Sequence, residues 1–327
     1  MQWLGFTGDV MLGRMVNEAA SERAPSDVWG DVLPHLQALD GLFVNLECCL
    51  STRGTPWTDT HRQFHYRADP EWAIPALEAA GVSWANLANN HVLDFEQPGF
   101  EDTLDHLDDA GMAHSGAGET EQAAREPALV SVGDLDVAVV SVTDTASDYA
   151  ASEDEPGVAY ARLDVEQDDQ RELVGESLRR AKDLDPDLLV ASLHWGQRMV
   201  VNPPAHHERF GRWLVEQGVD LVHGHSSHVL HGVEHAGGAP ILYDTGNFVD
   251  DFAPNRGLRN DLSFLFVAGV ADGDVQRLEL HPVKLTEDAV QEASEKQAQT
   301  ARDLVRERSE TYGTQFDRDG EALVVEF

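Results

Sequence analysis

Short apolar runs alternate with amphipathic segments along most of the chain, and this pattern constrains the fold more than any other feature. Segments with helical periodicity lie at residues 72–80, 99–110, 165–182 and 206–217. Strands that alternate with helices predict βαβ units and therefore an α/β fold. The strand-like runs are residues 3–7, 42–45, 83–87, 137–142, 188–193, 220–223 and 240–244.

The last part of the chain follows a different pattern. Residues 262–269 and 275–282 flank the turn sequence Ala271-Asp272-Gly273-Asp274, which predicts an antiparallel hairpin and hence mixed sheets. Residues 287–310 are charged and helical in propensity, and residues 322–327 can add a last strand. We therefore predict one catalytic unit over residues 1–285 and a helical C-terminal appendage over residues 286–327.

The chain is strongly acidic, because 59 Asp and Glu residues stand against 23 Lys and Arg residues, which gives a formal net charge of −36. The charge is dispersed, and only Lys182, Lys284 and Lys296 are lysines. This pattern is typical of a molar-salt cytoplasm, where screening within about 3 Å makes self-repulsion small. We expect a halophilic archaeal source, with an acidic interaction surface as the alternative. Binding to nucleic acid is not expected, because it depends on Lys and Arg contacts with phosphates.

No membrane segment is apparent in the sequence. No stretch approaches the ~18 consecutive apolar residues of a membrane-spanning helix. Residues 1–10 lack a basic segment followed by an apolar one and run directly into a predicted strand. We therefore expect a cytoplasmic protein without a secretion signal or membrane anchor.

Polar side chains follow five of the predicted strands. In α/β sheets, ligands gather beyond the carboxyl ends of the strands, so these side chains are expected to converge on one rim. Carboxylate, amide and imidazole ligands without thiolates suit Mn, Fe, Co or Zn. Each residue alone is also explained as an ordinary loop residue, but the joint pattern favours a metal site. The residues are Asp9, Glu47, Asn90, His91, His194, His225 and His228.

The order of these motifs resembles a known family. The chain is similar to the CapA/PgsA proteins of capsule and poly-γ-glutamate biosynthesis, which resemble calcineurin-type metallophosphoesterases. The resemblance extends over residues 5 to 252 and implies a calcineurin-like four-layer α/β/β/α sandwich with mixed β-sheets. The matching segments are residues 8–14 (GDVMLGR), 45–47 (NLE), 89–91 (NNH) with Asp94, 194–196 (HWG), 224–230 (GHSSHVL) and 243–248 (YDTGNF).

The resemblance also implies a role for each matching residue. Asp9 and His228 would bind a first metal, and Glu47 would take the place of the carboxylate that bridges two metals. The second metal would be bound by Asn90, His194 and His225. His91 would be the catalytic residue that protonates the leaving oxygen, since an imidazole with a pKa near neutrality is a suitable general acid.

The chain departs from the phosphoesterase pattern at three positions. Met11 replaces the histidine of the usual Asp-x-His motif, and Glu47 stands where an aspartate is usual. The last histidines, His225 and His228, form His-x-x-His in place of His-x-His. The resemblance therefore leaves open whether one or two divalent ions bind.

Other polar residues are candidates for substrate binding. Arg14, Arg67 and Arg198 lie in or beside the matching segments and suit anionic groups, although each is also explained by an ion pair with one of the many carboxylates. Asn247 is a further candidate. His206 and His207 begin a predicted helix and are interpreted as ordinary surface residues.

Two functions of different class follow from the sequence. The first is a CapA-like, metal-dependent hydrolase that acts on a phosphoester or related bond in a small or polymeric anionic substrate. The second is a non-catalytic accessory protein that binds the polymer during capsule or polyglutamate assembly. The strand-end residues favour the first function, and family membership is compatible with both.

Overall fold

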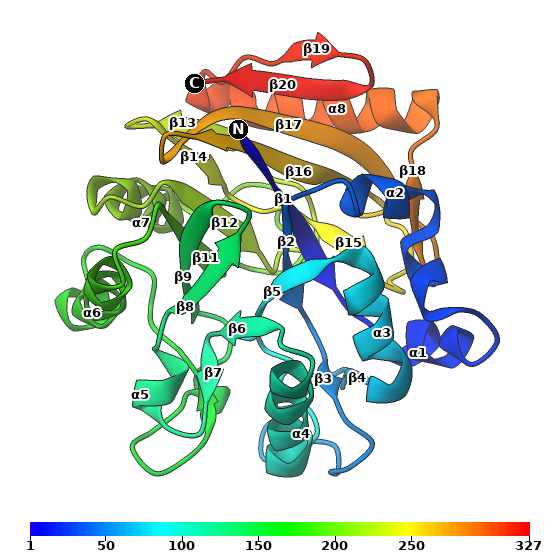
Figure 1. Cartoon of the computed structure of the whole chain (residues 1–327), viewed down its shortest axis with the longest axis vertical. Helices are drawn as coiled ribbons and strands as arrows, with labels where there is room; N and C mark the ends of the chain where they lie inside the picture. Colours follow the sequence, from blue (N-terminus) through cyan, green and yellow to red (C-terminus); the bar gives the residue numbers. More distant parts are fainter.

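The computed structural model describes residues 1–327 and contains two large mixed sheets (Figure 1). In the ten-stranded sheet, β1 runs parallel to β2 and β15, and antiparallel to β16. The strands in spatial order are β19 (Asp317–Asp319), β20 (Ala322–Glu326), β17 (Asp274–Leu285), β16 (Leu262–Ala271), β1 (Gln2–Val10), β2 (Gly41–Leu46), β5 (Val82–Asn86) and β6 (Ala113–Ser115), with β15 (Asn247–Val249) beside β1 and β18 (Val290–Glu292) beside β17.

The six-stranded sheet has a parallel centre and antiparallel edges. Its order is β13 (Val233–Ala236), β14 (Ala239–Leu242), β12 (Leu221–His225), β11 (Leu188–His194), β9 (Leu135–Thr143) and β8 (Ala128–Val132). Every residue of β11 and β12 is buried, which explains why these strands are read as apolar runs rather than alternating ones. Two short pairs complete the strands, β3 (Cys49–Leu50) with β4 (Arg67–Ala68) and β7 (Ala117–Gly118) with β10 (Gly157–Val158).

The two large sheets pack against each other through a shared hydrophobic core. Phe6, Phe43 and Trp84 from the ten-stranded sheet belong to one cluster with Val139 and Val190 from the six-stranded sheet. The predicted mixed α/β architecture is therefore confirmed. Helices cover the outer faces and belong to two further clusters. They are α1 (Arg14–Ala20), η1 (Pro25–Val32), α2 (Leu33–Leu36), α3 (Pro70–Ala80) and α4 (Glu96–Asp109) beside the larger sheet, and α6 (Asp168–Asp183) and α7 (Ala205–Glu216) beside the smaller one.

Local sequence signals set the ends of these helices. Asp69 caps α3 by accepting a hydrogen bond from the backbone N–H of Glu71, and Gly81 ends the helix with a φ of 75°. Helix α6 has the acidic Asp168 in its first turn and the basic Lys182 in its last turn. The helix dipole favours this arrangement, because the N-terminal end of a helix carries partial positive charge and the C-terminal end partial negative charge. The remaining helices are short: α5 (Glu121–Ala124), η2 (Ser147–Tyr149) and η3 (Glu310–Tyr312).

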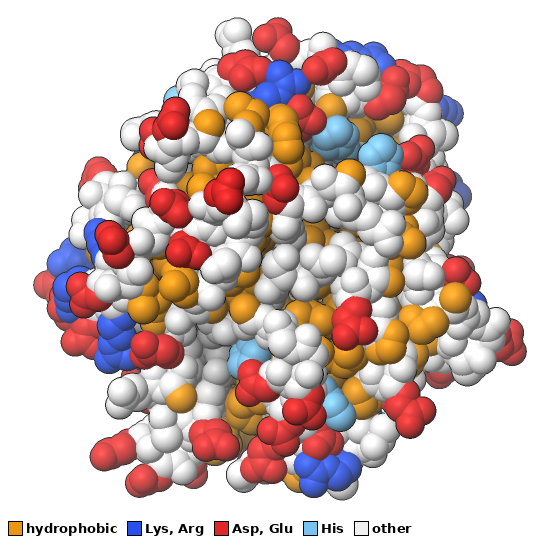
Figure 2. All heavy atoms as spheres, in the orientation of Figure 1, with side chains coloured by type: hydrophobic (Ala, Val, Ile, Leu, Met, Phe, Trp, Pro, Cys, Tyr) orange, Lys and Arg blue, Asp and Glu red, His pale blue; other side chains and the backbone are white.

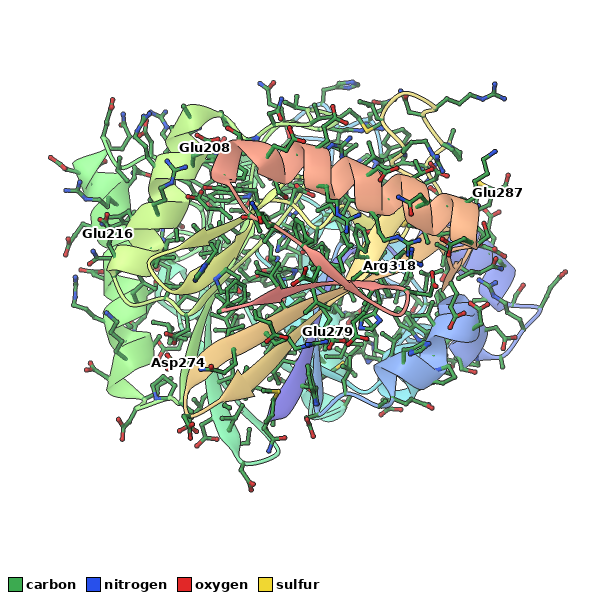
Figure 3. The ribbon with its side chains drawn as sticks, turned by 90° about the horizontal axis from the view of Figure 1, so that it is seen from above. Glu208, Glu216, Asp274, Glu279, Glu287 and Arg318 are labelled. Atoms are coloured by element: carbon green, nitrogen blue, oxygen red, sulfur yellow. The ribbon has the colours of Figure 1, made fainter.

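The segment 286–327 contains the expected helix and last strand. Helix α8 (Glu295–Ser309) places Ala301 and Val305 in the core between the sheets, and β20 pairs with β17. Seen from above, α8 runs along one side of the molecule (Figure 3). These residues share a sheet and a core with the rest of the chain.

The acidic side chains are spread over the surface. Figure 2 shows Asp and Glu at many separate places on this face, with fewer in its central part. Those labelled in Figure 3 lie far apart on the molecule: Glu208 and Glu216 on α7, Asp274 and Glu279 on β17, and Glu287 in the loop after β17. No helix has the length and apolar character needed to cross a membrane.

Candidate metal centre

The predicted strand-end residues come together where the two sheets meet. Strand register places His194 at the end of β11 opposite His225 at the end of β12, and Asp9 in β1 opposite Asn45 in β2. The sheets are joined here by Nε2 of His223, which donates a hydrogen bond of 2.7 Å to the carbonyl oxygen of Thr7. Parallel strands of both sheets therefore bring their carboxyl ends to one rim.

One group of possible ligands consists of Asp9, His194 and His225, whose ligand atoms all lie within 4.8 Å of one another. Nδ1 of His194 lies 2.9 Å from Nδ1 of His225. Nε2 of His194 lies 2.7 Å from Oδ1 of Asn90, so the amide predicted as a ligand is next to this group. The side-chain amide of Asn45 donates a hydrogen bond of 2.7 Å to Oδ1 of Asp9 and orients that carboxylate.

A second group consists of Asp9, Glu47 and His228. Nδ1 of His228 lies 3.0 Å from Oδ2 of Asp9, and its Nε2 lies 3.8 Å from Oε1 of Glu47. Asp9 belongs to both groups, whereas Glu47 belongs to one. Met11 takes no part, because its sulfur accepts a hydrogen bond from the backbone N–H of Gly13.

The loop that carries His228 has an uncommon backbone. Ser226 and His228 have φ values of 110° and 59°, a region that residues other than glycine rarely adopt. Asp244 stabilises this turn, since its Oδ2 accepts hydrogen bonds of 2.7 Å from both the backbone N–H and the hydroxyl of Ser227. Such conformations cluster at functional sites.

Four buried carboxylates lie at this centre, and burying several negative charges together is costly unless positive charge is close by. They belong to Asp9, Glu47, Asp244 and Asp250. Burial and the charge of Asp9 raise the pKa of Glu47 well above its ordinary value, and burial raises the pKa of Asp244 and of Asp250 to about 7. Burial also acts to raise the pKa of Asp9, but contact with His228 outweighs it and lowers that pKa. Oε1 of Glu47 accepts no hydrogen bond, and Oδ2 of Asp9 has the contact with His228 but no well-directed hydrogen bond. Buried carboxylate oxygens that lack hydrogen-bond donors fit a bound cation.

The histidines differ in protonation. Burial lowers the pKa of His194 to about 3 and the pKa of His225 well below its ordinary value, so both rings are neutral, the form that binds metals. Burial also acts to lower the pKa of His228, but its contact with Asp9 raises it to about 9. Without a metal His228 therefore carries positive charge beside the carboxylates, and a metal bound by His228 would displace that proton and supply the charge in its place.

His91 is positioned by a buried carboxylate. Its Nδ1 lies 2.5 Å from Oδ2 of Asp94, whose other oxygen accepts a hydrogen bond of 3.0 Å from the hydroxyl of Tyr149. Its ring stacks on Tyr66 with centroids 3.9 Å apart. Nε2 lies 3.7 Å from Oε1 of Glu47, and His91 lines the cavity beside the centre.

That cavity has a volume of about 290 Å³ and is lined by His91, Asn90 and His228 together with aromatic and basic side chains. Of the three predicted arginines, only Arg198 lines it. Arg198 is exposed, stacks over Phe252 at 4.3 Å and forms no ion pair.

The other predicted substrate-binding residues lie elsewhere. Arg14 pairs with Asp251 at 3.3 Å, and Arg67 stacks over Phe95 at 4.0 Å. Asn247 lies 2.8 Å from Nδ1 of His228 and does not line the cavity.

Sequence reasoning missed Arg62, which also lines the cavity. It donates a hydrogen bond of 2.8 Å to the carbonyl oxygen of Asn90 and pairs with Asp148 at 2.8 Å. It lies in a loop rather than at a strand end, so the strand pattern carried no signal for it. Its side chain stacks on Tyr149 at 3.7 Å, a contact between distant parts of the chain.

Comparison with known proteins agrees with the motifs. The sequence model of the family described as bacterial capsule synthesis protein PGA_cap matches residues 3–252. A protein of Mycobacterium tuberculosis described as a probable polyglutamine synthesis accessory protein is 33% identical over 324 residues, which cover 94% of this chain and 83% of the relative.

Two proteins named CapA are also similar. The capsule biosynthesis protein CapA of Bacillus anthracis is 29% identical over 75% of this chain and 58% of its own length. The PGA biosynthesis protein CapA of Bacillus subtilis is 27% identical over 75% of this chain and 62% of its own length. The chain therefore belongs to the bacterial capsule synthesis protein PGA_cap family, whose CapA members its motifs resemble.

Proposed function

We propose that the chain is a metal-dependent hydrolase of the calcineurin-like superfamily that acts on a phosphoester or related bond. The observation that carries this proposal is the pair of buried ligand groups that share Asp9. The face-to-face sheets with outer helices support the expected four-layer α/β/β/α sandwich.

The ligand geometry favours an arrangement different from the expected one. We propose Asp9, and not Glu47, as the carboxylate shared by two ions, because only Asp9 belongs to both groups. The ions, of Mn, Fe, Co or Zn, would supply an activated water and would polarise a phosphoryl oxygen. His194, His225 and Asn90 would hold one ion, and Glu47 and His228 the other.

The protein's own residues would then bind the substrate and move a proton. His91 would protonate the leaving oxygen from Nε2, while Asp94 binds Nδ1 and fixes the ring orientation. Arg198, which has no carboxylate partner, would bind an anionic group of the substrate. Arg62 lines the same cavity, but its charge is paired with Asp148.

The biological process follows from the relatives. Their names refer to capsule, PGA and polyglutamine synthesis, so we propose a role in making such an anionic polymer. The alternative is an accessory protein that binds the polymer without cleaving it. The name of the Mycobacterium tuberculosis relative and the unpaired Arg198 at the cavity favour this second candidate.

One experiment distinguishes the two functions. The purified protein is stripped of metal, reloaded with Mn, Fe, Co or Zn, analysed for ions per chain, and assayed on chromogenic phosphomonoesters and phosphodiesters. The hydrolase proposal predicts turnover in at least one metal form and none in the Asp9→Ala variant. Absence of turnover with all four metals, together with polymer binding that survives both chelation and Asp9→Ala, would reject the hydrolase in favour of the accessory role.

A further inference from the structure

A separate cluster of metal-ligating side chains lies at the start of α7. Asp144, which follows β9, and His206 and His207 in the first turn of α7 each place a ligand atom within 4.8 Å of the others. Nε2 of His207 lies 2.7 Å from Oδ2 of Asp144. His207 is 2% exposed, so its interpretation as an ordinary surface residue was wrong.

Neighbouring groups hold both His207 and Asp144 in place. The ring of His207 stacks on Trp195 with centroids 4.6 Å apart. Asp144 accepts a hydrogen bond of 3.2 Å from the backbone N–H of Gly196 at its Oδ1, and its own backbone N–H donates one of 3.3 Å to the carbonyl oxygen of His194. Ligands that are oriented in this way need little rearrangement on binding.

An independent observation comes from His231, which lines the same cavity of about 620 Å³. The side chain is 5% exposed, and Nε2 lies 2.7 Å from the carbonyl oxygen of Val200. Because a carbonyl oxygen only accepts hydrogen bonds, Nε2 carries the proton and Nδ1 has a free lone pair. Nδ1 is buried and has no hydrogen-bond partner. His231 therefore leaves a buried hydrogen-bond acceptor without a partner in a side chain that lines this cavity.

We propose that Asp144, His206 and His207 bind a divalent transition-metal ion, with His231 on the wall of the same cavity. Two imidazoles and one carboxylate form a donor set that suits zinc. The contact of 2.7 Å between Asp144 and His207 must open by about 0.6 Å, because ligand atoms around tetrahedral zinc lie about 3.3 Å apart. Three protein ligands leave a fourth position for a water or an anionic ligand.

The proposed zinc site lies next to the cavity of the candidate metal centre. Thr145 and Gly196 line both this cavity and the one beside the metal centre, so the two cavities adjoin. A cation here would offset the repulsion between an anionic ligand and a chain with a formal net charge of −36. This site goes beyond the proposed function, because it needs no hydrolysis in order to bind metal.

The test measures bound zinc in a variant whose candidate metal centre at Asp9 has been disrupted. Asp9→Ala removes the ligand that both groups of that centre share. Stripped protein is incubated with Zn²⁺, passed through a desalting column and analysed for zinc per chain. We expect the Asp9→Ala protein to retain one zinc ion, the Asp9→Ala/His206→Ala protein to retain none, and the Asp9→Ala/His235→Ala protein to retain one. His235 is an exposed histidine on β13 and serves as the matched control.

The outcomes separate this site from the proposed hydrolase. No retained zinc in Asp9→Ala, or zinc that remains after His206→Ala, would overturn the proposal. If Asp9→Ala does not fold, the same comparison is made in the natural sequence, where His206→Ala must bind one zinc fewer than His235→Ala; equal counts would overturn the site. Because the readout is bound zinc, a failure of the hydrolase assay leaves this test intact.

Discussion

Metal binding at the proposed centre is expected to stabilise the folded chain, and loss of one ligand is expected to weaken that effect. His225→Ala removes one imidazole from the group that contains Asp9 and His194. His225 is fully buried and neutral, and the unfolded chain offers no preformed site. The difference in Tm with and without metal therefore reports on ligation, whereas the Tm of the metal-free protein reports on packing.

The size of the effect follows from mass action. At a metal concentration 1,000 times the dissociation constant, binding adds about 4.1 kcal/mol to the free energy of unfolding. A chain of 327 residues has an unfolding entropy of roughly 0.7 kcal/mol per kelvin, so Tm rises by about 6 °C. If loss of one ligand weakens binding about 100-fold, the gain falls to about 1.4 kcal/mol and the rise in Tm to about 2 °C.

The assay is calorimetric unfolding of stripped protein with and without each metal, at one salt concentration. His223→Asn is the matched control, because His223 is a buried histidine on the same strand that belongs to neither ligand group. It loses its hydrogen bond to Thr7, so its metal-free Tm falls while its metal-dependent rise stays at about 6 °C. A rise in His225→Ala equal to that of the natural protein would refute the ligand assignment.

Three further predictions address other parts of the site. His91→Ala is expected to abolish turnover while the number of metal ions per chain stays unchanged, and a parallel loss of metal would show that His91 is a ligand. Arg198→Ala is expected to raise KM for an anionic substrate by about tenfold, since loss of a charged hydrogen bond costs about 1.5 kcal/mol. Arg198→Lys should restore part of the affinity. An unchanged KM in Arg198→Ala would show that Arg198 does not bind the substrate. Cys48 and Cys49 are buried, and burial raises the pKa of Cys48 to about 12, so neither thiol is expected to react with a thiol reagent at pH 8 until the chain unfolds. Rapid labelling of the folded protein would contradict that burial.

Much of the architecture was predictable from local pattern. The predicted helix at residues 206–217 is α7, and the predicted strand at residues 188–193 is β11. The hairpin at residues 262–282 is formed by β16 and β17. These features are recognisable because the spacing of apolar residues within a short segment decides which face it can bury.

The residues of the centre were also predictable, but their partners were not. Asp9, His194 and His225 were named because they end strands, and the structure brings them together. Arg14 pairs with Asp251, whereas Arg198 has no carboxylate partner. The sequence could not predict this difference. In a chain with 59 acidic residues, many carboxylates are available to each arginine, and only packing selects among them.

The sequence by itself determined the fold class, the family and the rim on which polar residues gather, because each depends on short-range pattern or on motif order. The tertiary structure decided that Asp9 belongs to both ligand groups, that Asp94 orients His91, and that His207 is buried against Asp144. Those contacts join side chains from separate strands, helices and loops. Their distances are set by the packing of two sheets and their covering helices, which no local segment specifies.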